Sequence, residues 1–237
     1  MALTNSERQK RYKLRNPKKA RSGRVKNRKI IREFLSNNKC ECGEYNPNKL
    51  CFHHKNNSEK DFKITNLVSY STNRLLSEIS KCIVLCQNCH AKLHIELKYK
   101  DRLFLLLNSY KNSPRYKRYN KESKLLLYFY KETCNCLNCN HDYNASLCFH
   151  HIDFATKKKA VSLLKTIPSI NKELSKTICL CRNCHEDFHC KYGRKTNQSQ
   201  LEQYIGKNVE PLKVDIKDYL PLIEQNISKY YNLSFSL

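Results

Sequence analysis

The sequence predicts an α+β protein that consists of two tandem copies of one small module. Three observations carry this prediction. The pentapeptide LCFHH, which we expect to form a short strand, occurs at 50–54 and again at 147–151. When the sequence is aligned with itself at an offset of 97 residues, Cys42 matches Cys139. At an offset of 95 residues, most of the residues in 78–94 match those in 173–189. Finally, each copy ends in an apolar segment with two histidines at i and i+4, which share one face if the segment is helical.

Each module is expected to contain the same elements in the same order. It opens with a short amphipathic helix, at Lys29–Ser36 or Lys124–Lys131. A pair of cysteines, the LCFHH strand and a polar connection come next, and the helix with the HxxxH pair closes the module.

The two modules are flanked by regions of a different character. Leu212, Ile216, Leu220, Ile223 and Ile227 recur at intervals of three or four residues, which predicts an amphipathic helix interrupted or restarted near Pro221. We expect this tail to pack on the modules or on a partner. The predicted organisation is a basic arm at 1–29, module 1 at 30–110, a linker at 111–121, module 2 at 122–193 and a helical tail at 194–237.

The charge of the chain indicates a polyanionic partner. Its 237 residues include 45 Lys and Arg against 21 Asp and Glu, a net charge of +24, which favours nucleic acid first and an anionic membrane surface second. The longest apolar runs, Leu103–Leu107 and Leu125–Tyr130, are far shorter than the roughly 20 residues of a spanning helix. The N-terminus lacks the apolar core of a secretory signal. We therefore expect an intracellular protein, in the cytoplasm or nucleus (of the host cell if the protein is viral).

The basic arm is expected to contact DNA phosphates. Residues 1–30 contain 12 Lys and Arg and a single acidic residue, Glu7. A solvated, flexible arm is the simpler alternative, but the charge of the whole chain favours phosphate contacts. The candidate DNA-binding residues are Arg8, Arg11, Arg15, Lys18, Lys19, Arg21, Arg24 and Arg28.

The cysteines indicate structural zinc, because clustered cysteines in a reducing compartment are more often metal ligands than disulfides. In module 2 the pairs Cys136/Cys139 and Cys181/Cys184 both have CxxC spacing, which fits tetrahedral zinc bound by four thiolates. In module 1 the pair Cys86/Cys89 is intact, whereas Cys40 and Cys42 have only one residue between them. We expect about two structural zinc ions per chain, one in each module.

The histidines suggest a second kind of metal site. Neighbouring residues on a strand point to opposite faces, so the two histidines of LCFHH cannot take the same role. One imidazole of each pair can join the helical HxxxH pair in a three-histidine metal site. The other is then free to act on a water molecule beside that metal.

These motifs resemble the HNH endonuclease family. The matching segments are FHH and, some 30 residues later, LCQNCHAKLH or LCRNCHEDFH. The resemblance implies ββα-metal modules braced by zinc, as in colicin-type DNases and HNH proteins of phages and mobile elements. It implies His53, His90, His94 and His150, His185, His189 as ligands of a catalytic divalent metal, and His54 and His151 as general bases. At the position of the asparagine that orients the base in this family, the chain has Lys81 and Lys176.

The resemblance implies a metal-dependent endonuclease, of homing or restriction type, acting on double-stranded DNA. The catalytic metal would be Mg²⁺, Mn²⁺ or Zn²⁺, and two sites in one chain would make a monomer that works as a pseudo-dimer. The alternative is a non-catalytic zinc protein that binds nucleic acid, such as a transcription or packaging factor. In that case the histidines would complete zinc sites or pack in the core.

Overall fold

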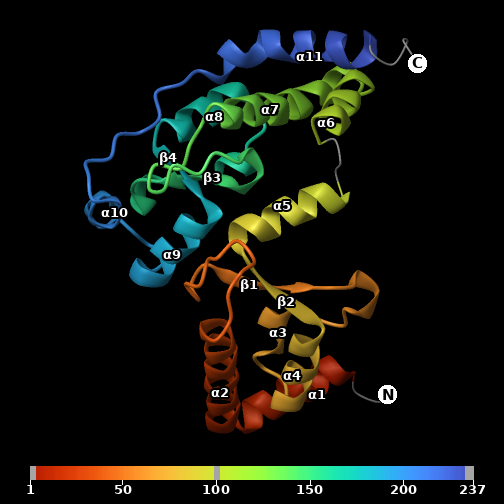
Figure 1. Ribbon diagram of the computed structural model, residues 1–237, viewed down its shortest axis with the longest axis vertical. Coiled ribbons are helices and arrows are strands. Elements are labelled where there is room, and N and C mark those ends of the chain that lie inside the picture. The colour runs from red at the N-terminus through yellow and green to blue at the C-terminus, as the bar shows by residue number, and fades with distance from the viewer. Residues whose placement is uncertain (1–3, 99–101, 233–237) are drawn as a thin grey trace. The chain divides into compact units, whose positions relative to one another are not determined.

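The computed structural model describes residues 4–98 and 102–232, and Figure 1 shows its course. The chain divides into two compact units, unit 1 at Met1–Cys86 and unit 2 at Gln87–Leu237. The fold is mixed α+β: the described residues form helices and two antiparallel sheets of two strands each. No described helix has both the length and the apolar character needed to cross a membrane.

Unit 1 contains four α-helices and one two-stranded sheet within its described residues. Its elements are α1 (Asn5–Arg15), α2 (Pro17–Ser36), β1 (Leu50–His54), α3 (Ile64–Leu67), α4 (Thr72–Ser80) and β2 (Cys82–Cys86). Helix α2 is much longer than the predicted helix at Lys29–Ser36 and runs through the predicted end of the basic arm. Pro17 occupies its first turn, where the missing N–H costs no hydrogen bond, and Phe34 packs on the core at its other end.

Helix α2 is anchored in unit 1 by a buried asparagine. Asn27 is 1% exposed, and its side-chain amide donates to the carbonyl oxygens of Val68 (3.3 Å) and Tyr70 (2.9 Å). The hydroxyl of Thr72 donates to Asn27 Oδ1 at 2.9 Å. One side chain thus satisfies three polar groups at the junction of α2, α3 and α4, around a core that includes Leu67 and its neighbours.

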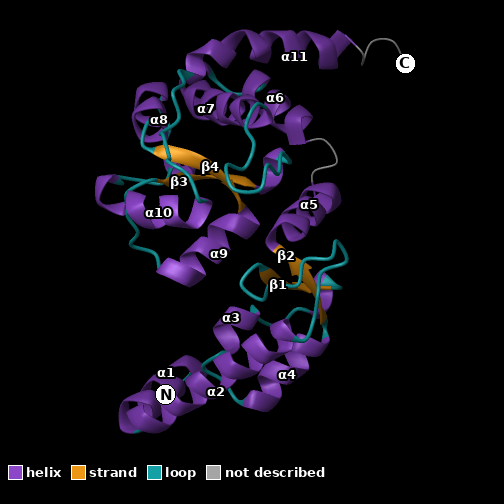
Figure 2. Cartoon of the chain, turned by 60° about the vertical axis from the view of Figure 1, so that its left-hand side comes forward, coloured by secondary structure: helices purple, strands orange, loops and turns teal. Residues whose placement is uncertain are grey.

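Unit 2 contains the second sheet and the remaining helices. Its elements are α5 (Gln87–Lys98), α6 (Arg102–Lys111), α7 (Arg115–Glu132), β3 (Leu147–His151), α8 (Ile167–Leu174), β4 (Thr177–Cys181), α9 (Arg182–Tyr192), α10 (Gln198–Ile205) and α11 (Leu220–Asn232). Helix α7 begins directly after Pro114 and covers most of the predicted linker as well as the helix predicted at Lys124–Lys131. In Figure 2, helices α7 and α8 lie on one side of the β3–β4 sheet and α9 and α10 on the other.

The two sheets have the same register. Strand β1 pairs with β2 so that His54 lies opposite Cys82, and β3 pairs with β4 so that His151 lies opposite Thr177. In both copies the second strand leads into the next helix without an intervening residue, since α5 begins at Gln87 and α9 at Arg182. The repeat seen in the sequence is therefore also a repeat of backbone structure.

The C-terminal tail packs on the rest of unit 2. Ile216 and Ile223 are buried in its core, and the backbone N–H of Leu212 donates to the carbonyl of Thr177 at the edge of β4. Pro221 is the second residue of α11, where proline is well tolerated, so it marks the start of that helix. Of the two expectations for the tail, the structure supports packing on a module, and that module is module 2.

We predict that Asn27→Ala destabilises unit 1 by about 2–3 kcal/mol, because it leaves buried carbonyl groups without their donor. Urea unfolding followed by circular dichroism measures the change. Asn73→Ala, on the exposed face of α4, is the matched control and is expected to change stability little. Equal stability of the two variants would contradict the anchoring role of Asn27.

Candidate metal centres

Four cysteines of module 2 form one group. Cys136 and Cys139 lie in the turn before β3, Cys181 ends β4, and Cys184 lies in the first turn of α9. Their sulfur atoms all lie within 4.8 Å of one another, and those of Cys139 and Cys181 are 3.7 Å apart. Zinc with Zn–S bonds of about 2.3 Å places tetrahedral sulfur ligands about 3.8 Å apart, whereas a disulfide needs about 2.05 Å. The spacing fits a four-thiolate zinc site.

A hydrogen bond to one of the sulfurs also suits a metal-bound thiolate. The side-chain amide of Asn138 donates to the sulfur of Cys184 at 3.3 Å. Metal-binding sulfurs are deprotonated and commonly accept such hydrogen bonds, so the chemistry of the donor set fits a zinc ion.

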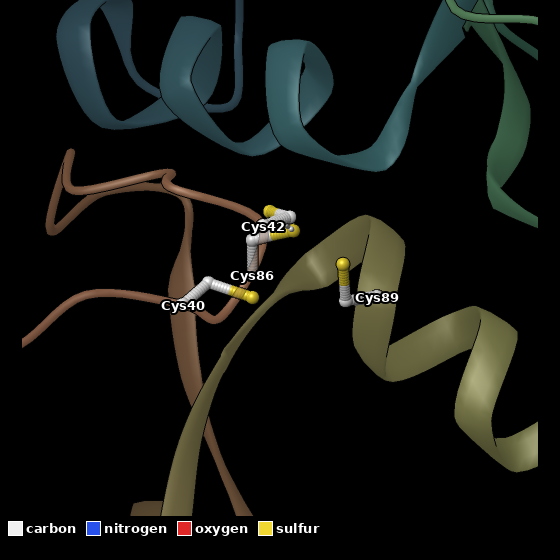
Figure 3. A group of neighbouring side chains, drawn as sticks. All are labelled: Cys40, Cys42, Cys86 and Cys89. Carbon is white, nitrogen blue, oxygen red and sulfur yellow. Dashed lines mark hydrogen bonds between the residues drawn. The ribbon is translucent and has the colours of Figure 1, made fainter.

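The cysteines of module 1 form an equivalent group, which Figure 3 shows: Cys40, Cys42, Cys86 and Cys89. The sulfur atoms of Cys42 and Cys86 are 3.8 Å apart, close to the distance in module 2. The shorter CxC spacing is accommodated by a tighter turn, because Gly43 adopts φ +90° and donates its N–H to the carbonyl of Cys40. Both tetracysteine groups can therefore hold zinc.

Three histidines of module 2 form a second group beside its sheet. His150 lies on β3, and His185 and His189 lie one turn apart on α9, with ligand nitrogens within 4.8 Å of one another. Among the described residues, the buried Nε2 of His150 has no hydrogen-bond partner. A buried nitrogen without a partner is costly in a protein core, so it points to a ligand at this position. An all-imidazole donor set suits Zn²⁺ or Ni²⁺ better than Mg²⁺.

The protonation of this group fits metal binding. Burial, together with the nearby His185 and His189, lowers the pKa of His150 to about 3. Burial likewise lowers the pKa of His185 to about 4. Neutral imidazoles are the form that binds metals, so these side chains carry a free lone pair at physiological pH.

The last histidine of the group is oriented by a backbone carbonyl. His189 Nδ1 lies 2.7 Å from the carbonyl oxygen of Gly193, to which it donates. Gly193 ends α9 with φ +86°, a conformation that glycine adopts readily and other residues adopt rarely. Because Nδ1 holds the proton, Nε2 is the nitrogen left for a metal, an arrangement common among metal-ligating histidines.

The corresponding histidines of module 1 are His53, His90 and His94. On α5, the Nε2 atoms of His90 and His94 are 3.3 Å apart. Nitrogen ligands on a tetrahedral metal with bonds of about 2.0 Å lie about 3.3 Å apart. The predicted ligand sets of both modules are thus brought together by the fold.

The second histidine of each LCFHH segment is held by a buried glutamate. In module 2, His151 Nε2 lies 2.9 Å from Glu173 Oε2, which also accepts from the backbone N–H of Lys158 at 3.2 Å. The Lys176 ammonium contacts the other carboxylate oxygen. Burial alone would raise the pKa of Glu173, but the hydrogen bonds from Lys176, His151 and Lys158 outweigh it and lower the pKa to about 2.

This contact fixes the tautomer of His151. Burial lowers the pKa of His151, although the hydrogen bond to Glu173 acts in the opposite direction, so the ring is neutral at physiological pH. An ionised carboxylate can only accept hydrogen bonds, so the ring proton of neutral His151 lies on Nε2. Its Nδ1 is therefore a proton acceptor.

Module 1 repeats this arrangement within unit 1. His54 Nε2 lies 2.8 Å from Glu78 Oε1, which also accepts from the backbone N–H of Asp61 at 3.1 Å. Lys81 donates to Glu78 Oε2 at 3.1 Å. In both copies the lysine therefore binds the glutamate, and the glutamate binds the histidine.

Sequence reasoning missed the role of these two glutamates, although a signal was present. Glu78 and Glu173 match each other when the sequence is aligned with itself at an offset of 95 residues. Each lies three residues before a lysine, Lys81 or Lys176. A glutamate lying 22 or 24 residues from its histidine has no recognisable spacing. Only the helix that precedes the second strand, α4 or α8, brings each carboxylate to the strand.

A small cleft opens beside the histidines of module 2. It has a volume of about 160 Å³, and His150, His151 and His189 line it together with the cationic side chains of Lys157 and Arg194. Pockets for drug-sized ligands usually measure about 300–1,000 Å³, so this cleft suits a single phosphate group better than a large ligand.

The predicted DNA-binding residues lie on the two N-terminal helices. Arg8, Arg11 and Arg15 are exposed on α1, and Arg24 and Arg28 are exposed on α2. Lys18, Lys19 and Arg21 also belong to α2, and their side chains lie outside the described part of the structure. The region predicted as a basic arm is therefore helical from Asn5.

Comparisons of the chain with protein-family models, with curated proteins and with solved structures found no match.

We predict that Cys181→Ser lowers the zinc content of the purified protein by about one ion per chain, since it removes one of four thiolate ligands. Metal analysis by mass spectrometry measures this. Cys190→Ser is the matched control, because Cys190 is exposed and lies outside both cysteine groups. An unchanged zinc content in Cys181→Ser would contradict a zinc site at this group.

Proposed function

We propose that the protein is a metal-dependent endonuclease of the HNH, or ββα-metal, type that hydrolyses phosphodiester bonds in double-stranded DNA. One observation carries this proposal. In each copy a strand places one histidine in a three-histidine group and the next against a buried, ionised glutamate. A non-catalytic zinc protein needs no such pairing beside its zinc sites.

The second histidine of each pair acts as the general base. In module 2, Nδ1 of His151 takes the proton of the attacking water. Glu173 accepts a hydrogen bond from the Nε2–H group, holds the ring in this tautomer and stabilises the imidazolium that forms. Lys176 compensates the buried charge of Glu173 and keeps its carboxylate in place.

The remaining groups act on the phosphate. When bound by the three histidines, a divalent metal supplies positive charge for the pentavalent phosphate and for the departing oxygen. Lys157 and Arg194 line the adjacent cleft and can contact the non-bridging phosphate oxygens. The cations of α1 and α2 add phosphate contacts that do not depend on base sequence.

The test of this function is cleavage of a supercoiled plasmid in the presence of Mg²⁺, Mn²⁺, Zn²⁺ or Ni²⁺. We expect the wild-type protein to produce linear DNA, and His54→Ala or His151→Ala to produce nicked circles, because each site cuts one strand. His141→Ala is the matched control, since His141 bonds to Ser146 and belongs to neither histidine group. It should cleave like the wild type.

The other outcomes are equally informative. EDTA should abolish cleavage. Binding of the plasmid without cleavage under any metal would establish the non-catalytic alternative. Linear product from either single variant would contradict the division of labour between two sites.

We predict that Glu173→Gln, tested in the His54→Ala background so that only module 2 cuts, lowers the cleavage rate by about 100-fold. This is the lower end of what a positioned general base contributes. A neutral amide can donate to His151 Nε2 and so favours the wrong tautomer. Glu210→Gln, an exposed carboxylate of the same unit paired with Lys213, is the control. A rate unchanged by Glu173→Gln would show that the base acts without its glutamate.

A further inference from the structure

The asparagines of the two repeated CxNC segments bond to each other. Asn88 is the second residue of α5, and Asn183 is the second residue of α9. The backbone N–H of Asn88 donates to Oδ1 of Asn183 at 3.0 Å, and the backbone N–H of Asn183 donates to Oδ1 of Asn88 at 3.2 Å. Both helices belong to unit 2.

This contact solves a problem that both helices share. The first N–H groups of a helix have no acceptor within the helix and need one from elsewhere. Usually a side chain at the start of the same helix provides it. Here each helix provides the acceptor for the other through the same residue of the repeat, as in an interface with twofold symmetry.

The contact also reaches the cysteine group of module 2. The side-chain amide of Asn88 lies near the sulfur of Cys181. Only an amide combines an acceptor oxygen with a donor nitrogen on so short a side chain. Asn183 is itself 9% exposed, so loss of its partner would leave a poorly solvated polar group.

We infer that Asn88 and Asn183 are positioning residues that join α5 and α9, N-terminus to N-terminus, as a pair with near-twofold symmetry. These helices carry the histidine pairs His90/His94 and His185/His189. The link then holds the two pairs at a fixed distance from each other, on helices that run in opposite directions. The two strands of a DNA duplex are also related by twofold axes. If the proposed nuclease function holds, the link sets a constant offset between the cuts in the two strands.

Hydrogen exchange of backbone amides tests the link without requiring activity. In the zinc-loaded, full-length protein, measured by NMR, Asn183→Ala should speed the exchange of the Asn88 amide by about tenfold, because its acceptor is gone. Asn183→Asp keeps an acceptor oxygen and should preserve the slow exchange. The reciprocal variant Asn88→Ala should speed the exchange of the Asn183 amide.

Two results would overturn the inference. One is an unchanged exchange rate of the Asn88 amide in a folded Asn183→Ala protein that keeps its zinc. The other is exchange of the Asn88 amide in Asn183→Asp that is as fast as in Asn183→Ala. If Asn183→Ala does not fold, Asn88→Ala and Asn183→Asp decide the question.

Sequencing of cleaved DNA ends provides the functional readout. The wild type should leave one fixed offset between its two cuts, and Asn183→Ala should leave a mixture of offsets or separate nicks. A single unchanged offset in Asn183→Ala would overturn the functional part of the inference. Absence of cleavage by the wild type would instead refute the proposed nuclease function, and the exchange experiment would still test the link.

Discussion

The arrangement of both metal groups depends on the direct junction between a strand and the helix that follows it. Strand β4 ends at Cys181 and α9 begins at Arg182, so two cysteines, an asparagine and a histidine lie within five consecutive residues. The antiparallel register places β3 beside this junction and brings His150 to the histidines of α9. A shift of the register by one residue would exchange the faces of His150 and His151 and dismantle both arrangements at once.

Because these modules are small, metal binding and folding are expected to be coupled. The tetracysteine group connects the turn before β3 to the end of β4, which are far apart in the sequence. Zinc bound there acts as a cross-link that the unfolded chain lacks. The buried glutamates add a different constraint, since a buried carboxylate is tolerated only when it is paired. Each has a histidine, a lysine and at least one backbone N–H.

The two copies keep the same interactions while their sequences differ. One residue fewer between Cys40 and Cys42 is absorbed by the turn at Gly43, and the sulfur spacing hardly changes. The His–Glu–Lys arrangement recurs with nearly the same distances. Retention of the cysteine group, the three-histidine group and the His–Glu–Lys arrangement in both copies is what two working sites would require. The reciprocal asparagines provide a means of holding the two histidine helices in a constant relation.

The sequence alone determined the repeat, the strand and helix of each copy, the grouping of cysteines and the grouping of histidines. These are local patterns or short motifs, and the chemistry of Cys and His makes their partners recognisable. Element lengths were less accessible: α2 and α7 extend well beyond their amphipathic segments, because the charged residues in their first turns show no apolar periodicity. Only the tertiary structure decided that Glu173 binds His151 and that Asn88 binds Asn183, because those contacts join residues 22 and 95 positions apart through packing that has no periodic signature.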